Sequence, residues 1–374
     1  MNGKTALRLR GFVRKEWLQI IRDPSSIAIA FVLPIILLLV FGYGISLDAR
    51  NIPLAIVTEN PGPVADSFTA GFNESPYFVP HAMFSIQEAE KALMEAEVNG
   101  IVWLRNNFDA DYLRKQEPPI SIIVNGMDAN TARLVEGYVQ GVWTGWLDHQ
   151  AQEQGKSLHV PVRVEQRIWY NPEVRSTDYL VPGIVAVIMT LIGALLTALI
   201  IAREWERGTM EAMLVTPVTV PEILFGKLIP YFILGMGGFA ISVLMAVYLF
   251  AVPLRGSLLV LLGASSLFLL TALGMGLLIS TVAKSQFVAA QAAIIVTFLP
   301  AFLLSGFIFD ISSMPTVVQG ITHLIAARYY VAILQTLFLV GNVWSVILPN
   351  ALALLLMSLF FLGMVFKKTN KRLQ

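Results

Sequence analysis

Six long apolar segments constrain this chain more than any other feature of its sequence. Each is long enough to cross about 30 Å of hydrocarbon as a helix, in which every backbone polar group is paired internally. The segments cover residues 25–47, 179–202, 228–251, 257–282, 287–308 and 344–366. The composition agrees, since only 14% of the residues are charged, against roughly 25% in soluble domains. The sequence therefore predicts a multi-pass membrane protein with six helical spans.

The distribution of basic residues predicts how these spans are oriented. Six spans put both termini on one side of the membrane, together with residues 203–227 and 283–286. In chain order, the four segments on that side hold six, three, one and four Lys or Arg residues. Because cytoplasmic loops are enriched in basic residues, we expect residues 1–24 and the tail 367–374 to be cytoplasmic.

A long insert separates the first two spans. Residues 48–178 carry ten basic and eighteen acidic residues and are long enough for a hydrophobic core of their own. Apolar alternation predicts strands in this insert, and amphipathic stretches predict helices. The strands are expected at Ile52–Thr58, Gly100–Arg105, Ile120–Asn125 and Val162–Trp169, and the helices at Ile86–Glu97 and Ala129–Gln152. By topology, this insert is an α/β domain outside the cytoplasm.

Two further segments are expected at the membrane boundary. In residues 1–24, apolar side chains gather on one side of a helix and basic ones on the other, which predicts a helix in the cytoplasmic membrane interface or packed on the protein's own surface. Residues 309–343 are too polar to span but are apolar on one side, which favours a re-entrant or interfacial hairpin. Residues 179–366 then form the membrane core with the second to sixth spans.

Charged residues crowd the segment that follows the second span. At 100° per residue, Glu204, Arg207 and Glu211 share one helix face with Arg203. Trp205 and two other apolar residues fall on the opposite face. A charged face with large apolar side chains beside it is typical of a docking surface for another protein, although a charged cytoplasmic loop has a similar composition.

A second helix is expected directly after this one. Pro217 ends the first helix because proline removes a backbone donor and disfavours helix at the preceding residue. Thr219 and Glu222 have the spacing of a capping box, with Pro221 tolerated in the first turn. Residues 203–227 are therefore predicted to form a cytoplasmic helical hairpin.

The residues around this hairpin resemble a known family. "LVPGIVAVIMTLIGALLTALIIAREWERGTMEAMLVTPVTVPEILFGKLIPY", Leu180–Tyr231, is similar to the central signature of bacterial ABC-2 type permeases, the membrane subunits of ATP-driven exporters, and most of all to the multidrug and multicomponent efflux branch. The likeness extends over essentially the whole chain. It implies a location in the bacterial inner membrane. Trp205 departs from the pattern, since relatives commonly carry Lys or another charged residue there.

The resemblance implies a role for the charged hairpin. In that family the segment after the second span is a coupling helix, which seats in a cleft of the ATPase subunit. The residues that would carry nucleotide-driven movement to the membrane helices are Arg203, Glu204, Glu206, Arg207, Gly208, Thr209 and Glu211. A dimer is also implied, with a second permease chain of the same or a similar kind and one ATPase per half.

The sequence offers little support for chemistry within this chain. Gly155-Lys156-Ser157 lacks the first glycine of a Walker A loop, so ATP and magnesium are expected to bind in a separate subunit and no cofactor is expected here. The six spans hold no Asp, Glu or His near their centres, which disfavours ion-coupled transport. There is no cysteine, and the four histidines show no metal-ligand or triad spacing.

A substrate path is expected between the two halves of the dimer. We expect an apolar, adaptable lining that suits hydrophobic or amphipathic compounds, formed by Ile184, Met189, Phe298, Phe302 and Phe307. The alternative is that these side chains face lipid or the core. A lipid or glycolipid exporter of the same architecture remains an alternative, as does a membrane-anchored binding or signalling protein.

The insert suggests one more partner. It is acidic in balance and carries Trp143, Trp146 and Trp169. It is expected either to gate the exit or to dock a periplasmic adaptor protein. Membrane lipids complete the expected partners, and no nucleic acid is expected.

Overall fold

The structure divides the chain into two compact units. It is a computed structural model, and it describes residues 3–44, 51–114, 120–126, 129–153, 175–209 and 219–369. One unit combines Met1–Ser46 with Arg167–Gln374 and is helical, and the other is Leu47–Gln166 and contains a small sheet. Each unit is described here by itself.

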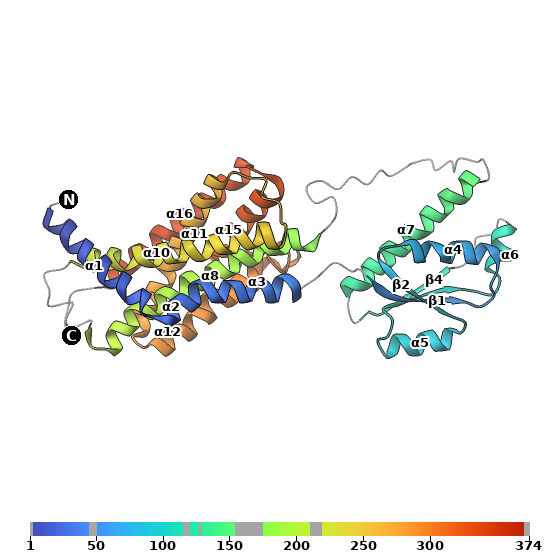
Figure 1. The fold of residues 1–374 in the computed structure, drawn as a ribbon, viewed down its shortest axis with the longest axis horizontal. Coiled ribbons are helices and arrows are strands. Elements are labelled where there is room, and N and C mark those ends of the chain that lie inside the picture. The colour runs from blue at the N-terminus through green and yellow to red at the C-terminus, as the bar shows by residue number, and fades with distance from the viewer. Residues whose placement is uncertain are drawn as a thin grey trace. The chain divides into compact units, whose positions relative to one another are not determined.

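The helical unit contains six helices that are long and apolar enough to cross a membrane, as the sequence predicts (Figure 1). A short helix, α1 (Gly3–Ile21), precedes them. The first span joins α2 (Pro24–Ile27), η1 (Ala28–Val32) and α3 (Leu33–Gly44). The others are α8 (Ser176–Glu206), α10 (Val220–Leu244) with η2 (Met245–Leu249), α11 (Leu258–Ala283), α12 (Gln286–Ala293) with η3 (Ile294–Phe298) and α13 (Leu299–Leu304), and α16 (Trp344–Lys368).

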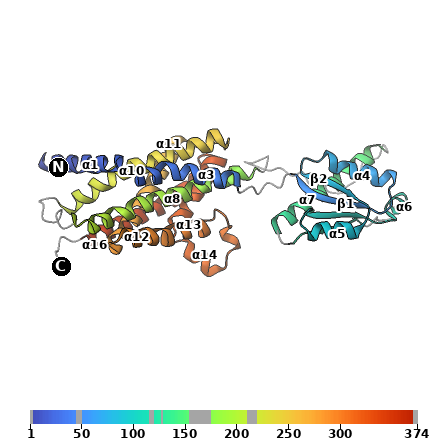
Figure 2. The ribbon, with the colours of Figure 1, turned by 60° about the horizontal axis from the view of Figure 1, so that its bottom comes forward.

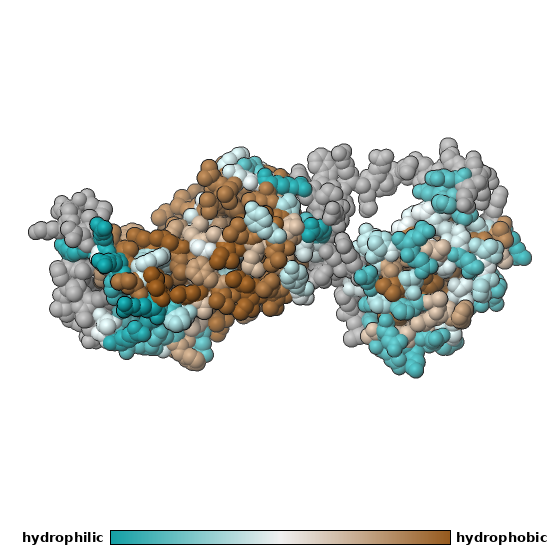
Figure 3. Space-filling model, in the orientation of Figure 1, coloured by the Kyte–Doolittle hydropathy of each residue, from teal (hydrophilic) through white to brown (hydrophobic). Residues whose placement is uncertain are grey.

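Helix α8 is the centre of this unit. Of its apolar window 89% is buried, whereas the corresponding shares in the other five spans lie between 17% and 50%. Figures 1 and 2 show α8 running through the bundle with the other spans around it. The outer helices leave large apolar side chains exposed, among them Ile36, Ile233 and Leu356. The brown surface in Figure 3 is this apolar face, and it suits hydrocarbon or a second apolar chain as its solvent.

Small and polar residues bring α8 and α11 into close contact. A Cβ added to Gly276 of α11 would collide with the carbonyl oxygen of Ala194 and the hydroxyl of Thr197 on α8. The Thr197 hydroxyl donates to the carbonyl of Leu273 at 2.9 Å, and Ser280 Oγ accepts from the backbone of α8 at 2.9 Å. Such small residues let helix backbones approach where burial of apolar surface gives little driving force.

The segment between α13 and α16 is a bent helix pair. Helix α14 (Thr316–Thr322) is followed by α15 (Ala326–Gln335) and η5 (Thr336–Val340), with a bend of 85° between them. Tyr330 of α15 is fully buried, stacks on Phe268 at 4.1 Å and hydrogen-bonds Ser265 of α11 at 2.7 Å.

This bent pair leaves the bundle and returns at the same end. Near its beginning, the Gly306 carbonyl accepts from Tyr179 at the start of α8. Near its end, Asn342 accepts from the backbone of Ser257 just before α11. Arg175 links those two places by donating to the Phe250 carbonyl at 3.2 Å. Both ends of the pair thus lie at the same end of the bundle, as a re-entrant or interfacial hairpin requires.

The second unit contains a four-stranded sheet in the order β2-β1-β3-β4. The strands are β1 (Ile52–Thr58), β2 (Phe78–Met83), β3 (Gly100–Leu104) and β4 (Ile120–Val124), and only β4 runs antiparallel to its neighbour. Helices α4 (Pro63–Glu74), α6 (Phe108–Leu113) and α7 (Ala129–Glu153) supply the core on one face, and α5 (Ile86–Met94) covers the other. Figure 1 shows this layering.

The pattern of β1 explains the two cores. Ile52, Leu54 and Ile56 point to one face and Ala55 and Val57 to the other, so both faces must be covered. Three expected strands are found as β1, β3 and β4, but β2, α4 and α6 were not predicted. The strand expected at Val162–Trp169 lies outside the described residues.

Two tryptophans of this unit belong to its core. Trp146 is 7% exposed and packs with Phe68 and Trp143. Trp143 is partly buried against the same core. Trp169 lies outside the described residues.

The contact at Gly276 gives a first prediction. Gly276→Ala is expected to destabilise the protein by about 1–3 kcal/mol, since the new methyl group must push α11 away from the α8 backbone. The thermal unfolding midpoint of the purified protein in detergent measures this. Gly263→Ala in the same helix is the control, because nothing lies within 4 Å of the added Cβ. Equal midpoints for the two variants would contradict the close α8–α11 contact.

Candidate functional site

Several helices meet at the end of the bundle where the charged hairpin begins. The end of α8 contacts the start of α10 through the ion pair of Glu204 and Lys227 at 2.9 Å. Phe366 near the end of α16 packs on Phe225 of α10 at 5.8 Å. The ammonium of Lys284, after α11, lies 4.9 Å from the Trp205 ring. Helix α1 packs along α10 at the same end (Figure 1).

Helix α10 begins as the sequence predicts. Thr219 is its N-cap residue, and Glu222 completes a capping box by accepting from the Thr219 backbone N–H at 2.7 Å. Pro221 occupies the first turn, where a missing donor has no cost. This start places Lys227 about two turns into α10, facing the end of α8.

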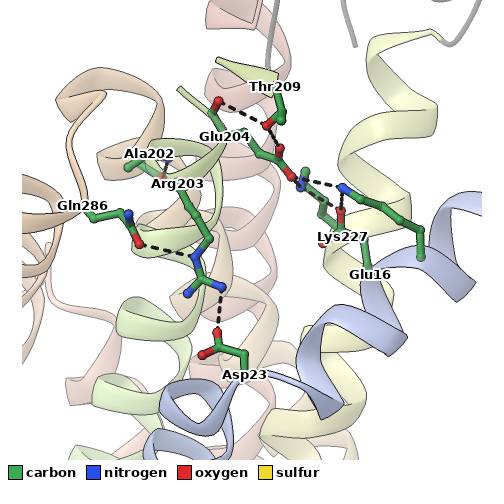
Figure 4. Close-up of polar contacts among 10 residues, drawn as sticks. Glu16, Asp23, Ala202, Arg203, Glu204, Thr209, Lys227 and Gln286 are labelled. Carbon is green, nitrogen blue, oxygen red and sulfur yellow. Dashed lines mark hydrogen bonds and ion pairs between the residues drawn. The ribbon is translucent and has the colours of Figure 1, made fainter. Parts of the chain in front are cut away.

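Four charged side chains, three of them buried and Lys15 half-exposed, form a cluster at this end (Figure 4). Lys227 donates to Glu16 Oε1 at 2.8 Å and to Glu204 Oε1 at 2.9 Å. Lys15 donates to the same two oxygens at 3.1 Å. The side chains of Lys227 and Glu16 are 1% exposed and that of Glu204 is 6% exposed. We call Lys15, Glu16, Glu204 and Lys227 the buried charge cluster.

The buried charge cluster is electrically balanced. Two ammonium groups face two carboxylates, so each buried charge has a partner of opposite sign. Although burial opposes its charge, the neighbouring Glu16 and Glu204 carboxylates raise the pKa of Lys15 above its ordinary value. Removing one member of such a cluster leaves an uncompensated buried charge, which is far more costly than the cluster is stabilising.

A second ion pair lies beside this cluster. Arg203 Nη1 donates to Asp23 Oδ2 at 2.6 Å, and Arg203 Nε donates to Gln286 Oε1 at 3.3 Å. Burial by itself raises the pKa of Asp23, but hydrogen bonds from Ser25, Arg203 and Ser26 and the Arg203 charge outweigh it and lower the pKa to about 2. Asp23 is therefore ionised throughout the physiological range. Its carboxylate also caps α2, so the pair ties α8 to the elbow between α1 and the first span.

The turn after α8 is fastened to both ion pairs. Gly208 has φ of +67°, a left-handed conformation that favours glycine. Thr209 donates its hydroxyl to the Glu204 carboxylate, and Glu206 accepts from the Gln286 backbone at 2.7 Å. These hydrogen bonds join the turn to α8 and to the start of α12.

The structure separates the predicted coupling residues into two groups. Glu206, Arg207, Gly208 and Thr209 are exposed. Arg203 and Glu204 are 8% and 5% exposed, because Asp23 and Lys227 hold both inside this chain, so neither belongs to an exposed charged face in this structure. Glu211, Ala212 and Met213 lie outside the described residues.

Trp205 and helix α1 also lie at this end of the bundle. Trp205 is half-buried at the edge of the helical core instead of presenting an exposed apolar face. In helix α1, Ile20 is buried against the bundle, as in a helix packed on the protein's own surface, whereas Trp17, Leu18 and Ile21 are 38%, 46% and 57% exposed.

Sequence reasoning missed four residues of this site. Lys15, Asp23 and Lys227 pair with the end of α8, and Glu16 pairs with Lys15 and Lys227, although none of these contacts was expected. Two signals pointed to them. Glu16 falls between Val13 and Ile20 on the inward side of α1, and Lys227 interrupts an apolar helix. A charge at an inward position needs a partner from another element.

Of the five residues suggested for a substrate path, Ile184, Met189 and Phe307 are buried, and Phe298 and Phe302 are partly buried. Ile184 and Met189 are 2% and 0% exposed within the core around α8. Phe298, Phe302 and Phe307 form a continuous aromatic row, with ring centroids 5.8 Å and 6.1 Å apart. Phe307 packs directly on Gly183, one residue before Ile184. The structure thus brings four of the five together, while Met189 lies further along α8.

Metal chemistry has no support in the described ranges, 3–44, 51–114, 120–126, 129–153, 175–209 and 219–369. Across them, no group of three or more His, Cys, Asp or Glu side chains is placed to hold a metal ion.

The buried charge cluster gives a second prediction. Lys227→Met is expected to destabilise the protein by about 3–5 kcal/mol, because two buried carboxylates then share one half-exposed lysine. Adding Glu16→Gln restores the charge balance and is expected to recover most of this loss. Thermal unfolding in detergent measures both, with Lys367→Met on the exposed end of α16 as the control. A double variant no more stable than the single one would show that Lys227 acts by packing and not by its charge.

Comparison with known proteins agrees with this architecture. The profile of the ABC-2 family transporter proteins matches residues 24–367. The chain is 45% identical to the probable multidrug ABC transporter permease YbhS of Escherichia coli K12, over 98% of this chain and 97% of that protein. It is 27% identical to the probable multidrug ABC transporter permease YbhR of the same organism, over 91% and 94%. It is also 23% identical to the linearmycin resistance permease protein LnrN of Bacillus subtilis, over 83% and 86%. The chain therefore belongs to the ABC-2 family of transporter membrane proteins.

Proposed function

We propose that this chain is the membrane subunit of an ATP-driven exporter of hydrophobic or amphipathic small molecules. Two permease chains and two ATPase subunits would make the complete transporter. The family assignment and six spans support a membrane subunit of this class. Two relatives whose names include "multidrug" support the substrate class.

The proposed orientation puts the buried charge cluster at the cytoplasmic end. Six spans return the chain to the side where it began, and basic residues concentrate in α1, the turn after α8 and the end of α16. Both termini are then cytoplasmic in the inner membrane. The sheet unit, Leu47–Gln166, lies outside the cytoplasm, where it gates the exit or binds an adaptor.

The exposed turn after α8 is proposed as the place where the ATPase acts. One observation carries this proposal: the turn is exposed at Glu206–Thr209, yet the residues just before it are buried in ion pairs with α1, α2 and α10. A force on the turn therefore reaches four helices at once. Helix α8 has 31 residues and a length of about 46 Å, so it carries the displacement to the far end of the bundle.

A second permease chain would complete the substrate path. The outer spans expose apolar side chains that a second copy or lipid must cover. The aromatic row of Phe298, Phe302 and Phe307 is partly exposed at Phe298 and Phe302, so it can extend toward such a partner. We propose that these phenylalanines line the path, with Ile184 and Met189 as supporting residues behind them. Export of a lipid or glycolipid by the same architecture is the second candidate, since its pocket would also be apolar.

The third prediction tests docking of the ATPase. The chain is co-expressed with candidate ABC ATPase subunits, and capture and ATP turnover are measured. Arg207→Glu reverses an exposed charge on the turn and is expected to weaken capture by roughly tenfold, a typical cost for reversing a charge at an interface rim. Arg255→Glu, an exposed residue near the start of α11, is the matched control and should bind normally. Equal capture by both variants would remove the turn from the docking surface.

The fourth prediction separates docking from coupling. The balanced double variant Lys227→Met with Glu16→Gln leaves the exposed turn unchanged but removes the buried ion pair between α10 and α1. It is expected to capture the ATPase like the wild type and to lose stimulation of ATP turnover by transported compounds. Normal stimulation in this variant would show that the buried charge cluster only stabilises the fold.

A further inference from the structure

A pocket of about 690 Å³ opens beside the buried charge cluster. It lies between α1, the elbow before the first span, the end of α8 and the start of α12. We call it the basic pocket, and its lining residues are Lys15, Leu18, Gln19, Arg22, Asp23, Ser25, Arg203, Arg207 and Gln286. Its volume falls within the range of ordinary ligand sites, roughly 300–1,000 Å³.

The charge of the basic pocket selects an anion. Four cationic side chains line it against one carboxylate, that of Asp23. Lys15 and Arg203 already have carboxylate partners. Arg22 and Arg207 are exposed and have no ion-pair partner among the residues that the structure describes. Two guanidinium groups of this kind suit a phosphate, which each can bind through two parallel hydrogen bonds.

The surroundings of the basic pocket add a requirement for apolar chains. Leu18, which lines the pocket, is 46% exposed, and Ile21, which precedes the lining residue Arg22, is 57% exposed. On the side of the spans, Ile27 follows the lining residue Ser25 and is 37% exposed, and Phe287 follows Gln286 and is 71% exposed. Figure 3 shows hydrophilic side chains at this end of the bundle directly beside the apolar surface. A ligand here meets cations at its head and hydrocarbon along its tail.

We propose that the basic pocket binds the phosphate headgroup of an anionic glycerophospholipid, with the acyl chains lying along Ile27 and Phe287. Basic pockets between membrane helices bind anionic headgroups in this way. An acidic segment of a soluble partner would meet the same cations, but it would leave these apolar side chains uncovered. The bound lipid would bridge α1, α8 and α12 and fix the elbow that Asp23 and Arg203 hold.

The test uses the purified full-length chain without any ATPase, so its result is independent of the proposed coupling. Retention of phosphatidylglycerol is measured by native mass spectrometry, with phosphatidylcholine as the neutral reference. The double variant Arg22→Gln with Arg207→Gln is expected to weaken retention roughly 30-fold. Each basic residue near an anionic headgroup contributes a factor of about tenfold or less, and the two factors multiply. The matched control is Arg10→Gln with Arg14→Gln, two exposed arginines of α1 outside the pocket, and it should retain phosphatidylglycerol normally.

Three results would overturn the proposal. Equal loss in the pocket and control variants would mean that α1 attracts anionic lipid without a defined site. Displacement of the lipid by inorganic phosphate at equal concentration would mean that the site takes free phosphate. Unchanged lipid retention in the pocket variant, together with loss of ATPase capture in a separate assay, would assign the pocket to a protein partner.

Discussion

The enclosure of α8 is the constraint on which the helical unit depends. A helix that is 89% buried over its apolar window cannot meet lipid, so the neighbouring helices must provide its surroundings. Gly276 and Thr197 let α11 approach it closely, and Phe307 packs directly on its Gly183. The two ends of α8 are then the places where this helix reaches the ends of the bundle. One end meets the bent helix pair through Tyr179, and the other enters the charged turn.

The two ends of α8 are built from different interactions for a physical reason. At one end of α8, the Tyr179 hydroxyl donates to the Gly306 carbonyl and Phe307 packs on Gly183, so a hydrogen bond and aromatic packing hold the segment that leads to the bent pair. At the other end Arg203 and Glu204 carry charge inward from the turn. Charges buried this deeply need partners of opposite sign, and Asp23 and Lys227 supply them from two other elements. Charge complementarity thus decides which elements are joined at that end.

The sequence predicted the spans well because hydrocarbon imposes one rule on length and polarity. It also placed the capping box of Thr219 and Glu222, whose spacing is local. It failed where the answer depends on contacts between distant residues. Glu204 has the same helical phase as an exposed Arg207, and only the position of Lys227, 23 residues later, decides that it is buried. Likewise, β2 has no clean alternation, because it is an edge strand with a mixed burial pattern.

The buried charge cluster is better suited to helices that shift against one another than to maximal stability. An apolar core of the same volume would be as stable or more so, since desolvation offsets much of the attraction between buried ions. The cluster also leaves Glu16 Oε2 without a hydrogen-bond partner among the described residues. An unsatisfied buried oxygen lowers the free-energy cost of any rearrangement that gives it a donor. Lys15 and Lys227 both reach Glu16 and Glu204, so a shift of α10 against α1 can exchange donors without leaving a carboxylate uncompensated. Helices joined in this way can change register while their charges stay paired.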